Sequence, residues 1–262
     1  KQLGIHTKPV LLGPITYLLL GKEKEAGFDR RDLIDRLLPV YEELLGKLSA
    51  AGAEWVQFDE PFLALDIDEK TRQLYDQVYE RLTKAANGAK LIVATYFEAL
   101  RENAETALKL SVQALHVDLV RGDQQLDALL PRIPAGLALS LGIVDGRNIW
   151  KNDYEASLAK IRQAVEALGA DRVWVGPSCS LLHVPIDLEL ETNEDSLPAE
   201  VKNWLAFAKQ KLVEVKDLAG LATGEVNADT QARFQANQAA QQSRRTSVLI
   251  HRPEVKARVE SI

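Results

Sequence analysis

The strongest constraint on the fold is the alternation of short apolar runs with helical patterns along the first two thirds of the chain. Six runs predict strands, at 8–14, 53–61, 89–97, 114–120, 136–146 and 172–180. Nearly continuous apolar strands are typical of a parallel sheet that is covered on both faces. Alternating strands and helices with right-handed crossovers build either an open doubly wound sheet or a barrel.

Helical periodicity fills the intervals between these runs and dominates the end of the chain. One face of the helix predicted over 30–50 carries Leu33, Leu37, Leu44 and Leu48. Pro39 lies inside that pattern and predicts a kink or a division of the helix. In 71–86, every fourth residue is apolar, at Leu74, Val78 and Leu82. One face of the helix predicted over 199–220 carries Val201, Leu205, Ala208, Leu212 and Val215.

The loops after the predicted strands favour the barrel over the open sheet. Neither the G-x-G-x-x-G fingerprint nor the GK[ST] phosphate loop occurs there, which weakens a nucleotide-binding interpretation. We therefore expect a TIM-type (β/α)8 barrel that lacks its first two strands, so that about six parallel strands are present. The expected domains are an incomplete barrel over 1–198 and, over 199–262, a helical extension with the start of an inter-domain linker. A chain that begins at Lys1 without any methionine is also expected to be a segment of a longer protein.

Composition limits the partners and the compartment. The 262 residues carry a formal net charge of −6, which gives no general attraction for nucleic acid or anionic lipid. No apolar stretch approaches the length of a membrane span. A single cysteine forms no internal disulfide, so a reducing, cytoplasmic location is expected.

Polar residues gather where the predicted strands end, which in a β/α barrel is the face that carries functional sites. They are Asp59, Glu60, Thr95, Tyr96, His116, Asp118, Asp145, Arg147, Asn148, Cys179 and His183. Each has a structural alternative. Asp59 and Glu60 precede a proline and are equally consistent with a turn and helix cap. His116 and Asp118 lie two residues apart and so share one face of their strand. Such a pair forms a structural hydrogen bond at least as often as it forms a catalytic dyad. A metal or thiol site at Cys179 and His183 lacks any C-x-x-C or H-E-x-x-H spacing to support it.

Several stretches together resemble the N-terminal half of cobalamin-independent methionine synthase, in that family's order and spacing. They include "KPVLLGPITYLLLGK", "AEWVQFDEPFLAL", "TYFEAL", "ALHVDLVRG", "GIVDGRNIW" and "WVGPSCSLLHVPIDL", and the resemblance extends over essentially the whole chain. It implies a methyltransferase of methionine biosynthesis with two face-to-face β/α barrels. The methyl group passes from 5-methyltetrahydrofolate polyglutamate, bound between the barrels, to homocysteine. The C-terminal barrel holds the zinc that activates the homocysteine thiol.

The same resemblance explains why the cysteine stands alone. The zinc barrel has a His-x-Cys pair, a Glu and a final Cys as ligands, whereas here Thr95, Tyr96 and Phe97 replace the pair. Asp118 stands near the Glu position and Cys179 at the last Cys position. We interpret Cys179 as the remnant of a ligand position and expect no metal, no cofactor and no catalytic residue in this segment.

The expected function is therefore that of the N-terminal, non-zinc half of the enzyme, inactive alone and supporting the C-terminal barrel. The resemblance leaves five candidates for a wall that faces the folate: Asp59, Glu60, Asp118, Asn148 and His183. One alternative is a self-sufficient enzyme of the same superfamily, either uroporphyrinogen-decarboxylase-like or transferring methyl groups with a corrinoid. Another is a purely structural module. Two open strand edges also predict self-association of the isolated segment.

Overall fold

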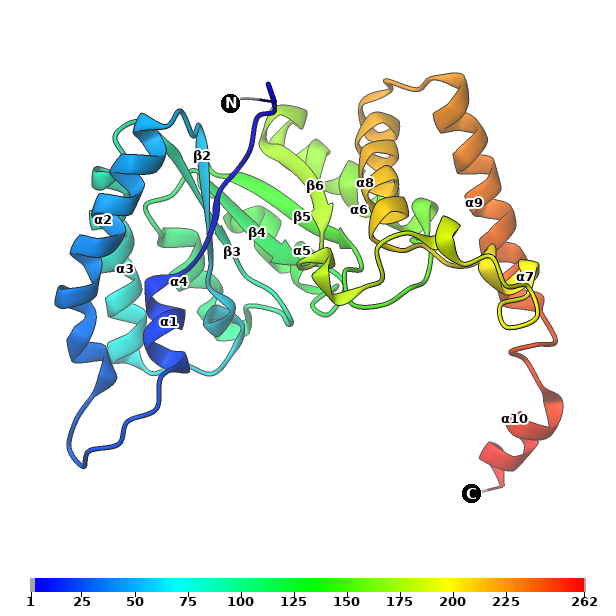
Figure 1. The fold of residues 1–262 in the computed structure, drawn as a ribbon, viewed down its shortest axis with the longest axis horizontal. Coiled ribbons are helices and arrows are strands. Elements are labelled where there is room, and N and C mark those ends of the chain that lie inside the picture. Colours follow the sequence, from blue (N-terminus) through cyan, green and yellow to red (C-terminus); the bar gives the residue numbers. More distant parts are fainter. Residues whose placement is uncertain (1–2, 262) are drawn as a thin grey trace. The chain divides into compact units, whose positions relative to one another are not determined.

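A computed structural model describes residues 3–261 and divides the chain into two compact units (Figure 1). The first comprises Lys1–Ile143 with Ala164–Cys179, and the second comprises Val144–Gln163 with Ser180–Ile262. Neither division coincides with the boundary expected between residues 198 and 199. The expected domains, 1–198 and 199–262, therefore stay a prediction.

The first unit is built on a six-stranded sheet whose strands follow one another in chain order. The strands are β1 Val10–Leu12, β2 Trp55–Asp59, β3 Lys90–Ala94, β4 Ala114–Asp118, β5 Ala138–Val144 and β6 Val173–Pro177. All are parallel, with registers such as Leu11 beside Phe58 and Leu115 beside Leu139. This confirms the predicted set of six parallel strands.

Two tryptophans show that the sheet curls. In a flat sheet, four strand spacings would separate β2 from β6 by about 19 Å. Instead the rings of Trp55 on β2 and Trp174 on β6 meet edge to face, with centroids 4.6 Å apart. Both rings pack on Ile92, Ala114 and Ala138 from the intervening strands. The sheet therefore wraps around a shared interior, as in a barrel that is open between β1 and β6.

Burial along the strands agrees with that open arrangement. Every residue of β4 and β5 is buried, whereas all of β6 is half-buried. On β1, Val10 is 52% exposed and Leu12 is 38% exposed. The two terminal strands thus lack the cover that the central strands receive on both sides.

The helices of the first unit include the two that the sequence predicts over 30–50 and 71–86. They are α1 Pro14–Leu20, α2 Ile34–Ala50, α3 Glu69–Ala85, α4 Ala104–Lys109 and α5 Gln125–Leu129. Asp68 caps α3 by accepting a hydrogen bond from the Thr71 amide at 2.9 Å, which fixes the first turn. In Figure 1, α2 and α3 lie side by side on the outside of the sheet.

One of the two alternatives predicted at Pro39 is excluded, and the predicted apolar face of the helix over 30–50 needs correction. α2 continues through Pro39 without dividing, so that a kink there stays the prediction. The buried side is formed by Ile34, Leu38 and Leu45, one residue later than the predicted leucine face. Leucines occupy both the predicted face and the buried face, so periodicity alone placed the buried face one residue too early.

The second unit is mainly helical. It contains the start of α6 Tyr154–Leu168, followed by α7 Ala199–Lys202, α8 Ala208–Thr223, α9 Ala228–Thr246 and α10 Pro253–Glu260. The single helix predicted over 199–220 is wrong, because the chain leaves helical geometry between α7 and α8. There the Trp204 carbonyl and the Ala206 amide pair with the backbone of Lys151 and Ile149. These long-range hydrogen bonds outweigh the local helical preference.

The buried face of α8 also differs from the predicted apolar face. Its buried residues are Lys211, Glu214, Asp217 and Leu218, whereas the predicted Leu212 is 58% exposed. In Figure 1, α8 and α9 run alongside each other. The charged face of α8 is thus buried in the interior of the second unit.

Candidate functional site

The carboxylate of Glu60, directly after β2, is the centre of a buried hydrogen-bond network in the first unit. It accepts from the Thr16 amide and hydroxyl at 2.9 and 2.6 Å and from the Ile15 amide at 3.3 Å. The hydroxyls of Tyr75 and Tyr79 on α3 donate to it at 3.1 and 2.9 Å. Burial raises the pKa of Glu60, and the hydrogen bonds from Thr16 and Tyr79 oppose that rise.

This network gives Glu60 a structural task. Its side chain is fully buried and ties the first turn of α1 and two tyrosines of α3 to the end of β2. It does not cap the short 3-10 turn that follows it, Pro61–Ala64. A Cβ on Gly13 would lie 2.1 Å from the Glu60 carboxyl carbon, so only glycine allows α1 to approach this closely.

Asp59, the last residue of β2, shares the interior side of its strand with Gln57. The Gln57 amide donates to Asp59 Oδ1 at 2.7 Å. The Tyr96 hydroxyl also hydrogen bonds to Asp59, and burial together with this bond raises the tyrosine pKa. Asp59 is half-buried, so its carboxylate keeps some solvent contact. Sequence reasoning named Asp59 and Tyr96 separately, and the structure brings them together.

His116 belongs to a compact polar group in the interior of the sheet. Its Nδ1 lies 2.8 Å from the Ser140 hydroxyl, and its Nε2 lies 3.5 Å from the Ser178 carbonyl. Since a carbonyl only accepts, the proton belongs on Nε2, and Nδ1 accepts from Ser140. Burial lowers the pKa of His116 to about 4, so the ring is neutral at pH 7. A Cβ on Gly142 would lie 2.8 Å from Nε2, so the glycine makes room for the ring.

Asp118 and Cys179 also lie in this unit and are buried. Asp118 Oδ1 accepts from the amides of Val120 and Arg121 at 2.8 and 2.9 Å, which orders the loop after β4. Cys179 is 5% exposed. Across residues 3–261, no group of three or more His, Cys, Asp or Glu side chains is placed to hold a metal ion.

Asn148 and His183, the two remaining candidates, belong to the second unit. The Asn148 amide donates to Asp145 Oδ2 at 2.5 Å, and its oxygen accepts from the Trp150 amide at 3.0 Å. His183 ends a 3-10 turn, Leu181–His183, and is exposed. The geometry of Asn148 is therefore set by its own loop, whereas the His183 ring reaches the surface.

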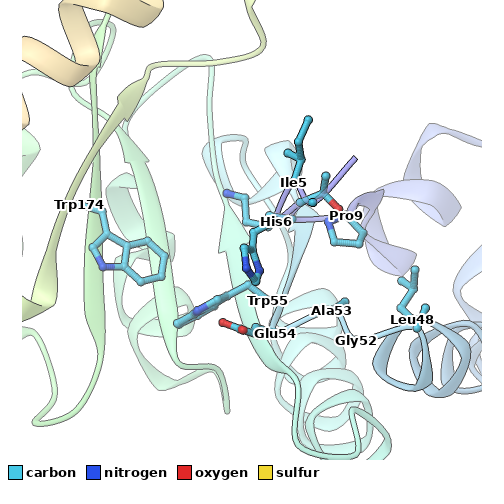
Figure 2. Close-up of a pocket in the computed structure, with 13 residues that line it drawn as sticks. Ile5, His6, Pro9, Leu48, Gly52, Ala53, Glu54, Trp55 and Trp174 are labelled. Atoms are coloured by element: carbon cyan, nitrogen blue, oxygen red, sulfur yellow. The ribbon is translucent and has the colours of Figure 1, made fainter. Parts of the chain in front are cut away.

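A cavity of about 760 Å³ lies at the opposite end of the strands (Figure 2). The segment 4–9, Leu48, the residues 51–55 and Trp174 line it. Figure 2 shows His6 directed toward Trp55, and the Lys90 ammonium lies 5.3 Å from the Trp55 ring centroid. About 13 Å of strand separates Trp55 from Asp59. Because the strand starts of β/α barrels contribute stability rather than catalysis, this cavity does not extend the candidate site.

Sequence reasoning missed the groups that hold the candidates in place. Tyr75 and Tyr79 stand four residues apart on a predicted helix, but the prediction selected leucine and valine for its buried side. Ser140 and Gly142 lie inside an apolar strand and carry no motif. The only signal available was the spacing of the tyrosines, which places both on one helical face.

Comparison with known proteins supplies the family. Residues 1–169 match the family model described as "Cobalamin-independent synthase, N-terminal domain". The chain is 53% identical over 264 residues to the 5-methyltetrahydropteroyltriglutamate–homocysteine methyltransferase of Flavobacterium johnsoniae, covering 100% of this chain and 34% of that protein. It is 51% identical over 262 residues to the protein of the same name from Cytophaga hutchinsonii, covering 99% and 34%. The chain thus spans about a third of the length of these relatives.

Solved structures support the fold. A B12-independent methionine synthase from Shewanella sp. W3-18-1, in complex with selenomethionine, superposes with a TM-score of 0.61 at 17% identity, covering 82% of this chain and 62% of that one. A methyltransferase from Methanosarcina mazei gives a TM-score of 0.52 at 14% identity, covering 69% and 55%. At these identities the likeness concerns the fold alone.

Proposed function

Because this chain belongs to the cobalamin-independent methionine synthase family through its N-terminal domain, we propose that it supports methyl transfer without carrying it out. The reaction is the one named for its relatives, from 5-methyltetrahydropteroyltriglutamate to homocysteine. The observation that carries the proposal is identity of about half along the whole chain to proteins three times as long. The working partner is the C-terminal barrel of the same enzyme.

Zinc does not fit the residues of this segment. A catalytic zinc takes about three protein ligands, and residues 3–261 offer no group of three suitable side chains. Cys179 is buried, and the imidazole of His116 already has both nitrogens engaged. In our proposal the zinc therefore belongs to the C-terminal barrel.

The proposed folate-facing wall contains fewer residues than the five expected candidates. Asp59 is half-buried and His183 is exposed, which supports keeping each of them in the proposed wall. Asn148 is half-buried and contributes an amide already ordered by Asp145. Glu60 and Asp118 have 0% and 1% exposure, so in our proposal they hold neighbouring backbone in place instead of touching the ligand.

The curled sheet supports a further part of the proposal. Two more strands between β1 and β6 would close the barrel and cover the half-exposed edges.

Across residues 3–261, no helix is both long and apolar enough to cross a bilayer. The family's activity and the single cysteine favour the cytoplasm as the place where the enzyme works.

The test is a calorimetric titration of this chain with 5-methyltetrahydropteroyltriglutamate, with zinc quantified in the same sample. Methyl transfer is then assayed with and without a separately produced C-terminal barrel. We expect turnover only when both barrels are present. Turnover by this chain alone, or stoichiometric zinc in it, would support the self-sufficient enzyme instead. If the chain contains no zinc, binds no folate and restores no turnover, the structural module is the remaining interpretation.

Matched variants locate the wall. Asp59→Asn and His183→Ala are expected to weaken folate binding, or to raise KM in the restored enzyme, about tenfold each, which is the cost of one charge-assisted hydrogen bond. Asp35→Asn, an exposed change on α2, is the control and is expected to leave both quantities unchanged. Equal behaviour of all three variants would remove these residues from the wall.

A further inference from the structure

The loop between β5 and α6, in the second unit, is held by side chains from far along the chain. Residues 145–153 contain no helix and only an isolated bridge, so their backbone groups need partners elsewhere. The Asn152 amide donates to Glu214 Oε1 on α8 at 3.0 Å, and the Asn152 carbonyl accepts from Asn237 Nδ2 on α9 at 2.8 Å. Two helices that follow the barrel strands in sequence therefore set the path of this loop.

Trp150 is the residue of this loop that α8 and α9 contact from different directions. Lys211 Nζ on α8 donates to the Trp150 carbonyl at 2.9 Å. The Arg244 guanidinium on α9 lies 4.0 Å from the centroid of the Trp150 ring, which is a cation–π contact. The tryptophan side chain also packs on the apolar cluster of Leu188, Leu205 and Phe207. Both the carbonyl and the ring of Trp150 are thus fixed in place.

The burial of Lys211 indicates that its hydrogen bond has a specific task. The residue is 0% exposed, and burial lowers the pKa of its ammonium group, while the negative charges of Glu214 and Asp145 oppose that shift. An apolar side chain of similar volume would fill the same space without the cost of desolvating a charge. What the lysine adds is a directed, charge-assisted hydrogen bond to a single carbonyl.

Trp150 in turn orients Asn148, one of the candidates for the folate-facing wall. The Trp150 amide donates to Asn148 Oδ1 at 3.0 Å, and Asn148 Nδ2 donates to Asp145 Oδ2 at 2.5 Å. These two bonds engage both ends of the amide group and so fix its plane. They use one of its two protons and one of its two lone pairs, which leaves the half-buried amide able to bind a ligand.

We propose that Lys211 and Arg244 are positioning residues that hold the Asn148 amide toward the folate. They act through Trp150 and touch no substrate themselves. Lys211 fixes the Trp150 carbonyl and Arg244 fixes its ring, so that the Trp150 amide stays directed at Asn148 Oδ1. This inference rests on the proposed function, because it assigns the loop to recognition of the methyl donor.

The first test is kinetic and uses the full-length enzyme of the proposed function. Lys211→Met keeps the length of the side chain, and Arg244→Gln changes a half-buried residue, so that at least the second variant is expected to fold. We expect each to raise the KM for 5-methyltetrahydropteroyltriglutamate about tenfold, which is the effect of one misplaced hydrogen bond. The kcat and the KM for homocysteine should not change.

A matched control separates positioning from folding. Lys216→Met, at an exposed lysine of α8, is expected to leave every kinetic parameter unchanged. A merely structural role of Lys211 and Arg244 would reduce the amount of folded enzyme and so lower kcat. A lower kcat at an unchanged folate KM therefore overturns the positioning role.

Asn148→Ala shows whether the effect passes through the Asn148 amide. On this background, Lys211→Met is expected to raise the folate KM no further, because the group that it orients is gone. The same increase on both backgrounds overturns the inference. Absence of methyl transfer by the unsubstituted full-length enzyme would instead refute the proposed function and, with it, the assignment of this loop to folate.

Hydrogen exchange tests the contact without any turnover. In Lys211→Met of this chain, the amides of Lys151 and Asn152 are expected to exchange at least about tenfold faster, because the loop loses one of its fixed points. The amides of α3, in the first unit, serve as the internal reference and should keep their rates. Unchanged exchange at Lys151 and Asn152 overturns the role of Lys211, whatever the activity of the enzyme.

Discussion

Glu60 illustrates at the scale of one residue how a polar group that follows a strand can serve structure instead of chemistry. Five donors from α1 and α3 surround its carboxylate. Glu60→Gln replaces one acceptor oxygen with a donor and leaves at least two buried donors without partners. We expect the free energy of unfolding to fall by about 2–4 kcal/mol, measured by urea denaturation. Glu43→Gln, at an exposed carboxylate of α2, should cost less than about 0.5 kcal/mol, and equal stability of the two variants would contradict the network.

Glu214 has a different consequence, a pH-dependent stability. Burial raises its pKa from 4.5 to about 7 in the folded chain. Between these values the folded state holds a proton that the unfolded chain has released, so stability falls as pH rises through this window and levels above 7. We expect Glu214→Gln to lose this decline and to gain up to about 3 kcal/mol relative to the unsubstituted chain between pH 5 and pH 8.

The measurement for Glu214 is the free energy of unfolding of both proteins at several pH values. Other titrating groups contribute equally to both proteins and cancel in the difference. Lys151, Lys211, Asp217, Tyr154 and Arg233 face Glu214 and keep their places in the variant. Glu225→Gln, at an exposed residue after α8, should follow the unsubstituted chain at every pH. A difference that does not change between pH 5 and pH 8 would show that Glu214 titrates normally.

At the scale of elements, α8 shows that the apolar face predicted from an amphipathic pattern can differ from the face that is buried. Its buried Asp217 accepts two hydrogen bonds from Arg233, one from Tyr154 and one from Thr230, whereas Leu212 is 58% exposed. Asp217→Asn is therefore expected to cost about 1–3 kcal/mol, since it replaces one buried acceptor oxygen of this network with an amide group that cannot accept. Leu212→Lys should stay within about 0.5 kcal/mol. Thermal unfolding ranks the two, and a larger loss for Leu212→Lys would restore the predicted apolar face.

At the scale of the whole molecule, the open sheet predicts association. β1 and β6 end the sheet on either side, and Val10 on β1 is 52% exposed. Unpaired strand edges with apolar side chains recruit further strands. We expect the isolated chain to self-associate and Val10→Lys to reduce the associated fraction, measured by light scattering after gel filtration. Val40→Lys, at a 62% exposed residue of α2, is the control. A monodisperse monomer for the unsubstituted chain would contradict the prediction.

The sequence by itself determined the order and parallel direction of the strands and the family. Strand–helix alternation and apolar runs are local signals, and they survive in any context that allows a hydrophobic core. For the same reason, α3 lies close to the segment 71–86, where periodicity predicts a helix. The incomplete barrel also follows from counting strands, because a closed barrel of this type needs eight.

Only the tertiary structure decided which polar groups are engaged and which face solvent. Glu60 meets donors 44 and 45 residues earlier, and Glu214 meets the Asn152 amide 62 residues earlier. The break between α7 and α8 likewise depends on backbone groups near Ile149. Burial and hydrogen bonding between distant segments have no local pattern, so a residue type at a strand end cannot reveal whether its side chain is occupied. The contact of Trp55 with Trp174 has the same origin, since curvature is a property of the whole sheet.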